Sequence, residues 1–424
     1  MRKTDKKRAV GQEEEVEPAI QLSLEGRMRL NLREFIIDTG LEAMRELLEE
    51  ERTAVCGLRY VRNAERDAHR AGHARGELVM GGRRVSVKRP RARTEDNQEV
   101  MLPSWKHFSA EDPLYDRAVE QMVVGVSTRK YNRSLENVPA SLGVRGTSKS
   151  AVSRRFVTST ATKLKKWMAR DLSKLELASV MIDGVYFAEH VILVALGIDE
   201  GGHKHVLGLW EGATENSASC TALIGNLRDR GLQADRSMLF VIDGSQALER
   251  TIRKAFGAYA LVQRCRVHKK RNVRDHLPEE MHNSVMTAMA AAYGDSNAER
   301  AKKLLENLAR KLEQDHPGAA ASLREGLAET LTLKTIGLSG GHIERIFSTT
   351  NAIENLNGTG RDVSRRVKRW RGGTMILRWM ATAMMEADKK FRRVQGHQEM
   401  PKLVAALRRN DEIVNRVDSA TTVA

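Results

Sequence analysis

The spacing of apolar residues changes from helical to strand-like near Leu177. Before it, over residues 22–70, apolar side chains recur every three or four positions, which is typical of helices that pack on one face. After it, short apolar runs rich in β-branched residues alternate with turns, which is typical of strands. The pattern predicts strands at Val180–Phe187, Val191–Ile198, His203–Trp210, Met238–Ile242 and Ala260–Gln263, and helices at Ser217–Arg230 and Gln246–Phe256.

This order predicts a mixed α/β fold and is similar to that of a ribonuclease H-like five-stranded catalytic core. We assign residues 175–276 to the first part of that core. Residues 277–340 have helical spacing and no strand candidate, so we expect an all-helical insertion, after which residues 341–405 return to the core. Residues 1–20 are charged and poor in apolar side chains, which predicts disorder. Residues 406–424 are expected to form a loose tail.

The region before the core is predicted to be mainly helical and to bind DNA. Residues 21–110 combine helices that could serve dimerisation with a hairpin at Glu77–Lys88 that turns at two glycines. The basic residues 89–93 form either a solvated edge or a ribbon that grips phosphates. Residues 111–170 resemble a helix-turn-helix, because a helix starting at Lys149 carries small polar and arginine side chains on its first turns. An ordinary packed helix pair is the alternative, and the net charge favours DNA binding.

The charge balance narrows the class of partner. Lys and Arg number 71 against 55 Asp and Glu, and the resulting net charge of +16 attracts polyanions, so we expect nucleic acid as the partner. Membrane binding is not expected, since no apolar stretch approaches the roughly 20 residues of a spanning helix. No apolar segment follows the charged start, so we expect no secretory signal. Three scattered cysteines do not make a disulfide framework, which fits a reducing cytoplasm.

Two predicted strands carry the same dipeptide, an aspartate followed by a glycine. Asp183-Gly184 belongs to the first strand and Asp243-Gly244 follows the fourth. Asp-Gly alone usually marks a plain turn. Here both aspartates are expected at neighbouring strand ends, where two carboxylates repel each other unless a cation lies between them. Mg²⁺ takes oxygen ligands, so the pair predicts a magnesium site.

Phosphodiester chemistry at such a site needs a third carboxylate from later in the chain. We select Glu354, which lies among polar residues with helical apolar neighbours. Asn357 falls one turn further on and is expected to share the exposed face of that helix. Glu344 is the second choice for the third carboxylate.

Cys265 and His268 follow the last predicted strand at once. Their spacing could form half a zinc site, completed by His276 or His282. Because no second cysteine follows, we favour a packed cysteine and a histidine near the reacting phosphate. The basic residues after them are expected to form a cationic rim for the DNA backbone: Lys269, Lys270 and Arg271.

Taken together, the motifs resemble the Mutator-type transposases of bacterial insertion sequences. The resemblance lies in an ordered series: Asp183-Gly184, Gly208-Leu209-Trp210, Arg230-Gly231-Leu232, Asp243-Gly244, Cys265-Arg266-Val267-His268 with Arg271-Asn272, and Thr350-Asn351-Ala352-Ile353-Glu354. Segments at 125–129 and 368–373 extend it, so that it covers roughly residues 75–405.

The resemblance implies a DDE transposase with Asp183, Asp243 and Glu354 as metal ligands and with Cys265 and His268 beside them in the active site. The implied cofactor is Mg²⁺, for which Mn²⁺ should substitute. Such an enzyme binds the terminal inverted repeats of its element, nicks DNA and transfers a 3′-hydroxyl end to target DNA. A homodimer is implied because two ends must be held together, and the bacterial cytoplasm, at the nucleoid, is the implied location.

Contacts to DNA are assigned to small polar and basic residues of three segments: Lys149, Ser150, Arg154, Arg155, Lys269, Arg271, Arg361, Arg365, Arg366 and Arg369. Two alternatives stay open. One is a catalytically silent DNA-binding regulator derived from a transposase, which the presence of all three acids opposes. The other is a ribonuclease H-like nuclease without strand transfer, which the DNA-binding region and the helical insertion oppose.

Overall fold

The chain folds into two compact units. The computed structural model describes residues 24–61, 66–80, 83–110, 144–145, 149–187, 189–212, 216–365, 367 and 369–423. The first unit comprises Met1–Glu120 and Thr128–Val152, and the second Gln121–Ser127 and Ser153–Ala424. The expectation of disorder over residues 1–20 and most of the helix-turn-helix segment lie outside the described residues, so both stay predictions.

The first unit packs helices against a basic hairpin. Its elements are α1 (Leu24–Cys56), β1 (His69–Met80), β2 (Arg83–Arg93), β3 (Glu99–Val100), α2 (Pro103–Ala110) and β4 (Val144–Arg145). The strands pair in the order β1-β2-β3, and β4 also pairs with β2. Leu78 of β1 and Val85 of β2 lie opposite each other and are buried with Leu41 and Leu48 of α1. This apolar contact between hairpin and helix gives the unit its own core.

The predicted hairpin is confirmed, and it is longer than its apolar pattern indicates. β1 begins at His69 rather than Glu77, and the basic residues after the turn continue β2. The extra strand residues are polar, so no alternation marks them. They are fixed instead by cross-strand pairing and by Arg70, whose guanidinium donates to Thr53 Oγ1 of α1 at 2.8 Å. The helix predicted as far as residue 70 ends before Gly57, which has a φ of 77°.

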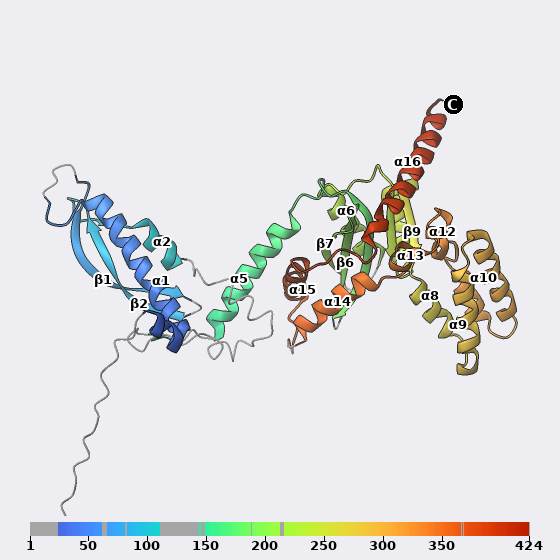
Figure 1. The fold of residues 1–424 in the computed structure, drawn as a ribbon, viewed down its shortest axis with the longest axis horizontal. Helices are drawn as coiled ribbons and strands as arrows, with labels where there is room; N and C mark the ends of the chain where they lie inside the picture. Colours follow the sequence, from blue (N-terminus) through green and yellow to red (C-terminus); the bar gives the residue numbers. More distant parts are fainter. Residues whose placement is uncertain are drawn as a thin grey trace, which may run out of the picture. The chain divides into compact units, whose positions relative to one another are not determined.

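The second unit is a five-stranded mixed sheet between two layers of helices, with a helical bundle beside it (Figure 1). Its strands are β5 (Leu177–Phe187), β6 (His190–Asp199), β7 (Lys204–Gly212), β8 (Met238–Ile242) and β9 (Ala260–Arg264). Its helices are α5 (Lys149–Met168, whose first residues are counted with the first unit), α6 (Ser217–Asp229), α7 (Gln246–Phe256), α8 (Arg266–Arg274), α9 (Glu279–Gly294), α10 (Ala298–Leu312), α11 (Pro317–Arg324), α12 (Thr332–Thr335), α13 (Gly341–Phe347), α14 (Asn351–Ser364), α15 (Gly373–Asp388) and α16 (Met400–Val423). Short 3-10 helices are η1 (Gly257–Tyr259), η2 (Ala328–Leu331) and η3 (His397–Glu399). Among the described residues no helix is long and apolar enough to cross a membrane.

The strands lie in the order β7-β6-β5-β8-β9. β5, β6 and β7 are antiparallel, whereas β5 and β8, and β8 and β9, are parallel. Every strand and helix predicted between residues 177 and 264 is confirmed, with ends that differ by a few residues. Side-chain caps explain two of the helix starts: Asn216 accepts from the Ser219 N–H at α6, and Ser245 from the Leu248 N–H at α7.

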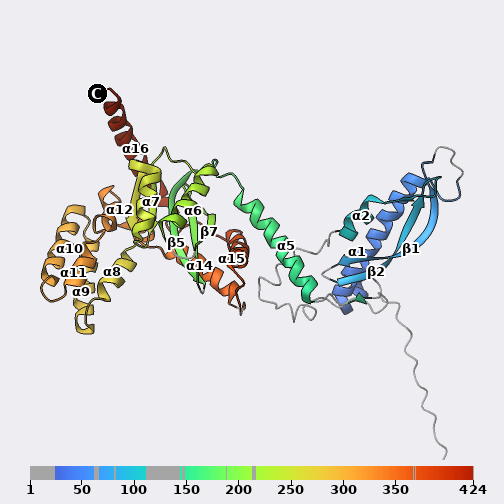
Figure 2. The same ribbon diagram turned by 180° about the vertical axis from the view of Figure 1, so that it is seen from behind.

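Different helices bury the two faces of the sheet. α6 and α7 cover one face of the sheet, and α14, α15 and α16 pack on the other. Figure 2 shows the molecule turned by 180° from the view of Figure 1. Alternate residues of β5 divide between the two cores: Val180 and Ile182 pack with α6 and α7, Met181 and Val185 with α14. Since side chains alternate along a strand, Asp183 emerges on the α14 face.

The helical bundle from α8 to α11 carries its own apolar core. Val273 of α8, Met289 of α9, Leu305 of α10 and Leu323 of α11 are buried in one cluster. No strand occurs between residues 265 and 350, all of which are described. The predicted absence of strands over 277–340 is therefore confirmed, and the bundle lies beside the β9 edge of the sheet (Figures 1 and 2).

The C-terminal segment is a helix rather than the loose tail that the sequence predicts. α16 extends to Val423, and its Leu403 and Leu407 are buried in the core beneath the sheet. Further along, the Tyr259 hydroxyl donates to Asn415 Oδ1 at 2.7 Å. The prediction was wrong because apolar side chains of this segment, Leu407 and Val414, are buried and because the contact to Tyr259 holds it as well.

Candidate functional site

Asp183 and Asp243 lie level with each other on neighbouring parallel strands. β5 and β8 pair at a constant offset, with Val180 opposite Phe240. The same offset sets Asp183 beside Asp243, which directly follows β8. Asp243 is fixed locally, because its Oδ1 accepts a hydrogen bond from the Ser245 N–H at 3.0 Å.

The two Asp-Gly pairs differ in their local structure. Gly244 has a φ of 122°, and a Cβ there would lie 2.2 Å from the Nε of Arg264, so this position requires glycine. β5 instead continues past Asp183 and Gly184 to Phe187, paired with β6. The expectation that both aspartates end a strand is therefore correct for Asp243 and wrong for Asp183, because the longer antiparallel partner extends β5.

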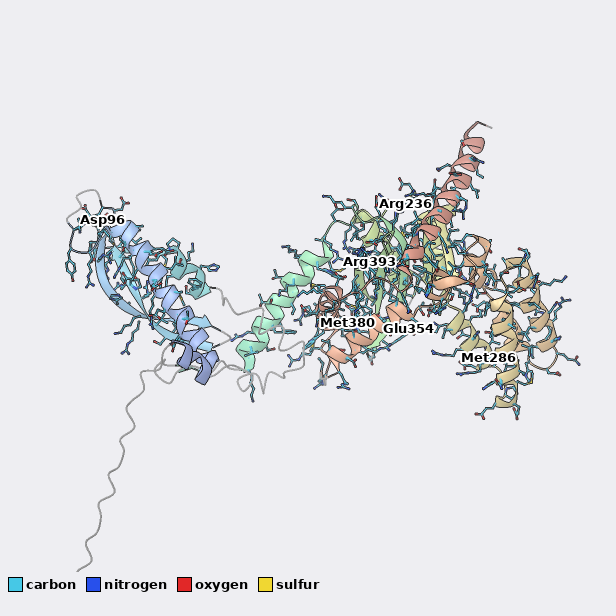
Figure 3. All side chains as sticks on the ribbon, viewed as in Figure 1. Asp96, Arg236, Met286, Glu354, Met380 and Arg393 are labelled. Carbon is cyan, nitrogen blue, oxygen red and sulfur yellow. The ribbon has the colours of Figure 1, made fainter. Side chains whose placement is uncertain are left out.

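Glu354 enters the site from α14 (Figure 3). This helix packs on the face of β5 that carries Asp183. The side chain of Glu354 is 41% exposed and so remains open to solvent. Asn357, one turn later, donates from Nδ2 to Asp183 Oδ2 at 2.8 Å. The sequence predicts an exposed Asn357, but it is only 1% exposed, because this part of α14 faces the sheet.

The electrostatics of Asp183 reflect its burial and the charges of the other two acids. Burial raises the pKa of Asp183, and the negative charges of Asp243 and Glu354 raise it further, to about 6. Hydrogen bonds from Asn357 and from the Gly184 N–H act in the opposite direction. Mutually repelling, partly buried carboxylates are the arrangement that a bound divalent cation relieves.

Thr350 connects the Cys265-x-x-His268 motif to Glu354. The Cys265 N–H donates to the Ile242 carbonyl at 2.7 Å, which holds the start of α8 against the end of β8. The hydroxyl of Thr350 donates to Glu354 Oε1 at 2.5 Å. The hydroxyl oxygen of Thr350 also lies 3.4 Å from both Cys265 Sγ and His268 Nδ1. Side chains that are far apart in sequence are therefore joined through one hydroxyl group.

Cys265 and His268 also shift each other's proton affinity. A hydrogen bond to Cys265 raises the pKa of His268, and the nearby charges of Asp243 and Glu354 act in the same direction. Burial raises the pKa of the Cys265 thiol, but hydrogen bonds to His268 and Thr350 leave it below its ordinary value. A cationic imidazole is thus favoured beside the carboxylates.

Cys265, His268 and Glu354 are also close enough to share a metal ion. Their ligand atoms lie within 4.8 Å of one another, and the described residues hold no other such group of three. His276 and His282, the sequence candidates for completing a zinc site, do not join it, and His282 Nε2 instead lies 2.9 Å from a backbone carbonyl. A metal ion bound by Cys265 and His268 would also bind Glu354, and it would draw this carboxylate away from the two aspartates.

Glu344, the second choice for the third carboxylate, is engaged elsewhere. Arg266 donates to its Oε1 at 2.6 Å, and Lys334 Nζ lies 2.7 Å from the same oxygen. These partners keep the pKa of Glu344 below its ordinary value although burial alone would raise it. A buried carboxylate held by two cations is structural.

Most of the residues assigned to DNA are exposed. The described ones with exposed side chains are Lys149, Ser150 and Arg154 of α5, Arg271 of α8, and Arg361, Arg365 and Arg369 at and after the end of α14. The side chains of Arg155 and Arg366 lie outside the described residues. Lys270 is partly buried, with Nζ 5.8 Å from the ring centre of Tyr293.

Lys269 does not reach the surface, which corrects its assignment to the DNA rim. Its side chain is fully buried, and Nζ donates to the carbonyls of Ser322 and Glu325. Burial lowers the pKa of Lys269 to about 8. α8 turns Lys269 toward α11 and Arg271 toward solvent, a difference that composition alone does not reveal.

The sequence also contains a spacing that indicates part of this arrangement. Thr350, Glu354 and Asn357 stand at i, i+4 and i+7, which places them on one face of a helix. That spacing predicts that Thr350 and Glu354 lie within hydrogen-bonding reach of each other.

Known proteins similar to this chain are transposases. The chain belongs to the Mutator family of transposases, whose family model matches residues 20–394. It is 25% identical over 370 residues to the transposase for insertion sequence element IS256 in transposon Tn4001 of Staphylococcus aureus, which covers 84% of this chain and 88% of the relative. It is 26% identical over 352 residues to the transposase for element IS905 of Lactococcus lactis, which covers 78% and 83%. It is 26% identical over 323 residues to the transposase for element ISRM5 of Rhizobium meliloti, with 74% and 78% covered. The resemblance predicted from the motifs is therefore confirmed, and the protein is an enzyme of DNA transposition.

Proposed function

We propose that the protein is a metal-dependent DDE transposase with a ribonuclease H-like core, in which Asp183, Asp243 and Glu354 hold the metal ions. One observation carries the proposal. Asp183 of β5 is partly buried beside Asp243 at the end of β8 and Glu354 of α14, and its burial together with their negative charges raises its pKa to about 6. Neighbouring acids without a cation would be an unfavourable feature of the fold.

The residues fit Mg²⁺, with Mn²⁺ as a substitute. The donors are hard carboxylate oxygens, which these ions prefer. When bound, such ions stabilise the charge that develops on the attacking and departing oxygens of a phosphodiester. Among the protein's own groups, Asn357 orients the Asp183 carboxylate and Thr350 orients that of Glu354.

His268 is suited to act beside the reacting phosphate. It lies 3.8 Å from Glu354, and its raised pKa favours the protonated ring. A protonated His268 can donate a hydrogen bond to a phosphate oxygen or hold a proton near the departing 3′-oxygen. Cys265, its hydrogen-bonded partner, keeps the ring in place.

Exposed basic and small polar residues are proposed to hold the terminal inverted repeats and the target DNA: Lys149, Ser150, Arg154, Arg271, Arg361, Arg365 and Arg369. Arg155 and Arg366, whose side chains lie outside the described residues, are assigned to the same role. Two ends must be brought together for strand transfer, so a homodimer is the proposed working form. Chromosomal DNA in the bacterial cytoplasm is the proposed site of action, in keeping with the bacterial relatives.

The test is incubation of the protein with Mg²⁺ and a duplex that carries an element end, with nicks and joints mapped at nucleotide resolution. Asp183→Asn, Asp243→Asn and Glu354→Gln should each abolish nicking while end binding persists. Nicking that survives these changes would remove the carboxylate site. Glu344→Gln separates the two candidates for the third acid, since its loss should lower stability rather than act at the chemical step.

The same assay separates the alternatives. Joints between an element end and target DNA require strand transfer and are expected. Nicks without joints would indicate a nuclease, and binding without nicks would indicate a silent regulator.

A further inference from the structure

Asn357 has one half of its amide engaged and the other half unsatisfied. Nδ2 donates to Asp183 Oδ2, and a carboxylate oxygen can only accept, so the amide must turn its NH₂ group toward Asp183. Oδ1 therefore points away from that oxygen. It is buried and has no hydrogen-bond partner among the described residues, in a side chain that is 1% exposed.

An unsatisfied buried carbonyl is normally unfavourable, so its persistence needs a reason. The amide that carries this oxygen lies against Asp183 through Nδ2, and Asp183 is a carboxylate under the field of Asp243 and Glu354. Another oxygen dipole at this place is repelled unless positive charge is nearby. The same cation that would relieve the three carboxylates would also satisfy this oxygen.

The position of Asn357 in the sequence supports that role. It follows Glu354 by three residues on α14, so both side chains leave the same face of the helix. Glu354 lies at the open side of the site, whereas Asn357 lies at its buried base against Asp183. One helical turn thus presents two oxygen donors to one small region.

We infer that Asn357 is a further metal ligand, which contributes its side-chain Oδ1 to the divalent cation held by Asp183, Asp243 and Glu354. The inference rests on the metal site proposed above. Amide carbonyl oxygens are ordinary ligands of hard divalent cations, and a neutral fourth donor adds no further repulsion to the site. The NH₂ group of the same side chain would fix the direction of Asp183 at the same time.

The test measures metal binding rather than activity. Mn²⁺ is titrated into the metal-free full-length protein, and free Mn²⁺ is followed by its electron paramagnetic resonance signal. Asn357→Ala and the volume-preserving Asn357→Leu should each weaken Mn²⁺ binding about 10-fold or more. Asn357→Asp keeps an oxygen at the position and should bind Mn²⁺ at least as tightly as the wild type. Asn355→Ala, an exposed asparagine on the same helix, is the matched control and should leave the affinity unchanged.

Each contrary result points to a different conclusion. If the wild type binds Mn²⁺ and Asn357→Ala and Asn357→Leu bind it equally well, the inference is wrong and the carboxylate site stands. If Asn357→Asp loses affinity as much as Asn357→Ala, the side chain acts only through its N–H on Asp183, and Oδ1 is not a ligand. A wild type that does not bind Mn²⁺ would overturn the metal site and this inference with it. Thermal unfolding in EDTA verifies that each variant is folded.

Discussion

The ionised form of Asp183 is unfavourable in the metal-free site. Its pKa in the folded protein, about 6, is above the ordinary value of 3.8, so the folded state binds this proton more tightly than the unfolded chain does. The stability that protonation of Asp183 gives the fold is complete below the pKa of this group in the unfolded chain, and it is lost as the pH rises through about 6. Relative to that protonated state, the metal-free fold at neutral pH is less stable by about 3 kcal/mol.

Asp183→Asn should therefore stabilise the metal-free protein at neutral pH, by about 1–3 kcal/mol. The advantage over the wild type should shrink as pH falls from about 7 to about 5, because the wild-type carboxyl then takes up its proton. Thermal unfolding in EDTA across this range measures both effects. A variant that melts at the same temperature as the wild type at every pH would contradict the raised pKa of Asp183.

Asp199 provides a control of opposite sign. Burial acts to raise its pKa, but hydrogen bonds from His205 and from the His203 N–H hold it below the ordinary value. The folded state thus favours the ionised form, and this stability is present above the unfolded pKa and lost as pH falls. Asp199→Asn should destabilise the protein at neutral pH, where Asp183→Asn stabilises it.

The secondary structure of the sheet could be predicted because its signal is local. Runs such as Met238–Ile242 are fully buried, and their apolar, β-branched content is visible in the sequence itself. Asp243 was located correctly for that reason. The directions of Lys269 and Asn357 could not be found in this way, because each is decided by a helix or strand far away in the chain. The same holds for the end of α16, where Asn415 accepts a hydrogen bond from Tyr259, a residue far away in the chain.

α8 gives a direct test of this difference between neighbouring basic residues. Lys269 is buried and bonds two carbonyls, so Lys269→Ala should lower the free energy of unfolding by about 3 kcal/mol. Arg271 is exposed, so Arg271→Ala should leave unfolding unchanged and weaken DNA binding. Denaturant unfolding and DNA titration of both variants measure the two effects. A loss of stability in Arg271→Ala, or a normally stable Lys269→Ala, would reverse the assignment of the two faces.

The net charge of +16 acts on DNA as a whole, but only exposed charges can release counterions from the phosphates. Several basic side chains are buried inside the fold and cannot reach DNA, among them Lys269, Lys334 and Arg266. The exposed ones on α5, on α8 and at the end of α14 belong to different elements of the chain. Binding should therefore depend on many separate phosphate contacts, with no single residue dominating.

Affinity for an element end should accordingly fall steeply with salt. For about 6–10 phosphate contacts the loss is about 10³–10⁵ between roughly 50 and 200 mM salt. Asp243→Asn, which should bind without cutting, allows the measurement by fluorescence anisotropy in the presence of Mg²⁺. In that background Arg154→Ala should lower the slope of log K against log salt by about 1. Lys311→Ala, an exposed charge of α10 outside the assigned segments, should leave the slope unchanged. A salt-independent affinity would mean that binding does not arise from the basic surface, and equal slopes for all three proteins would exclude α5 from it.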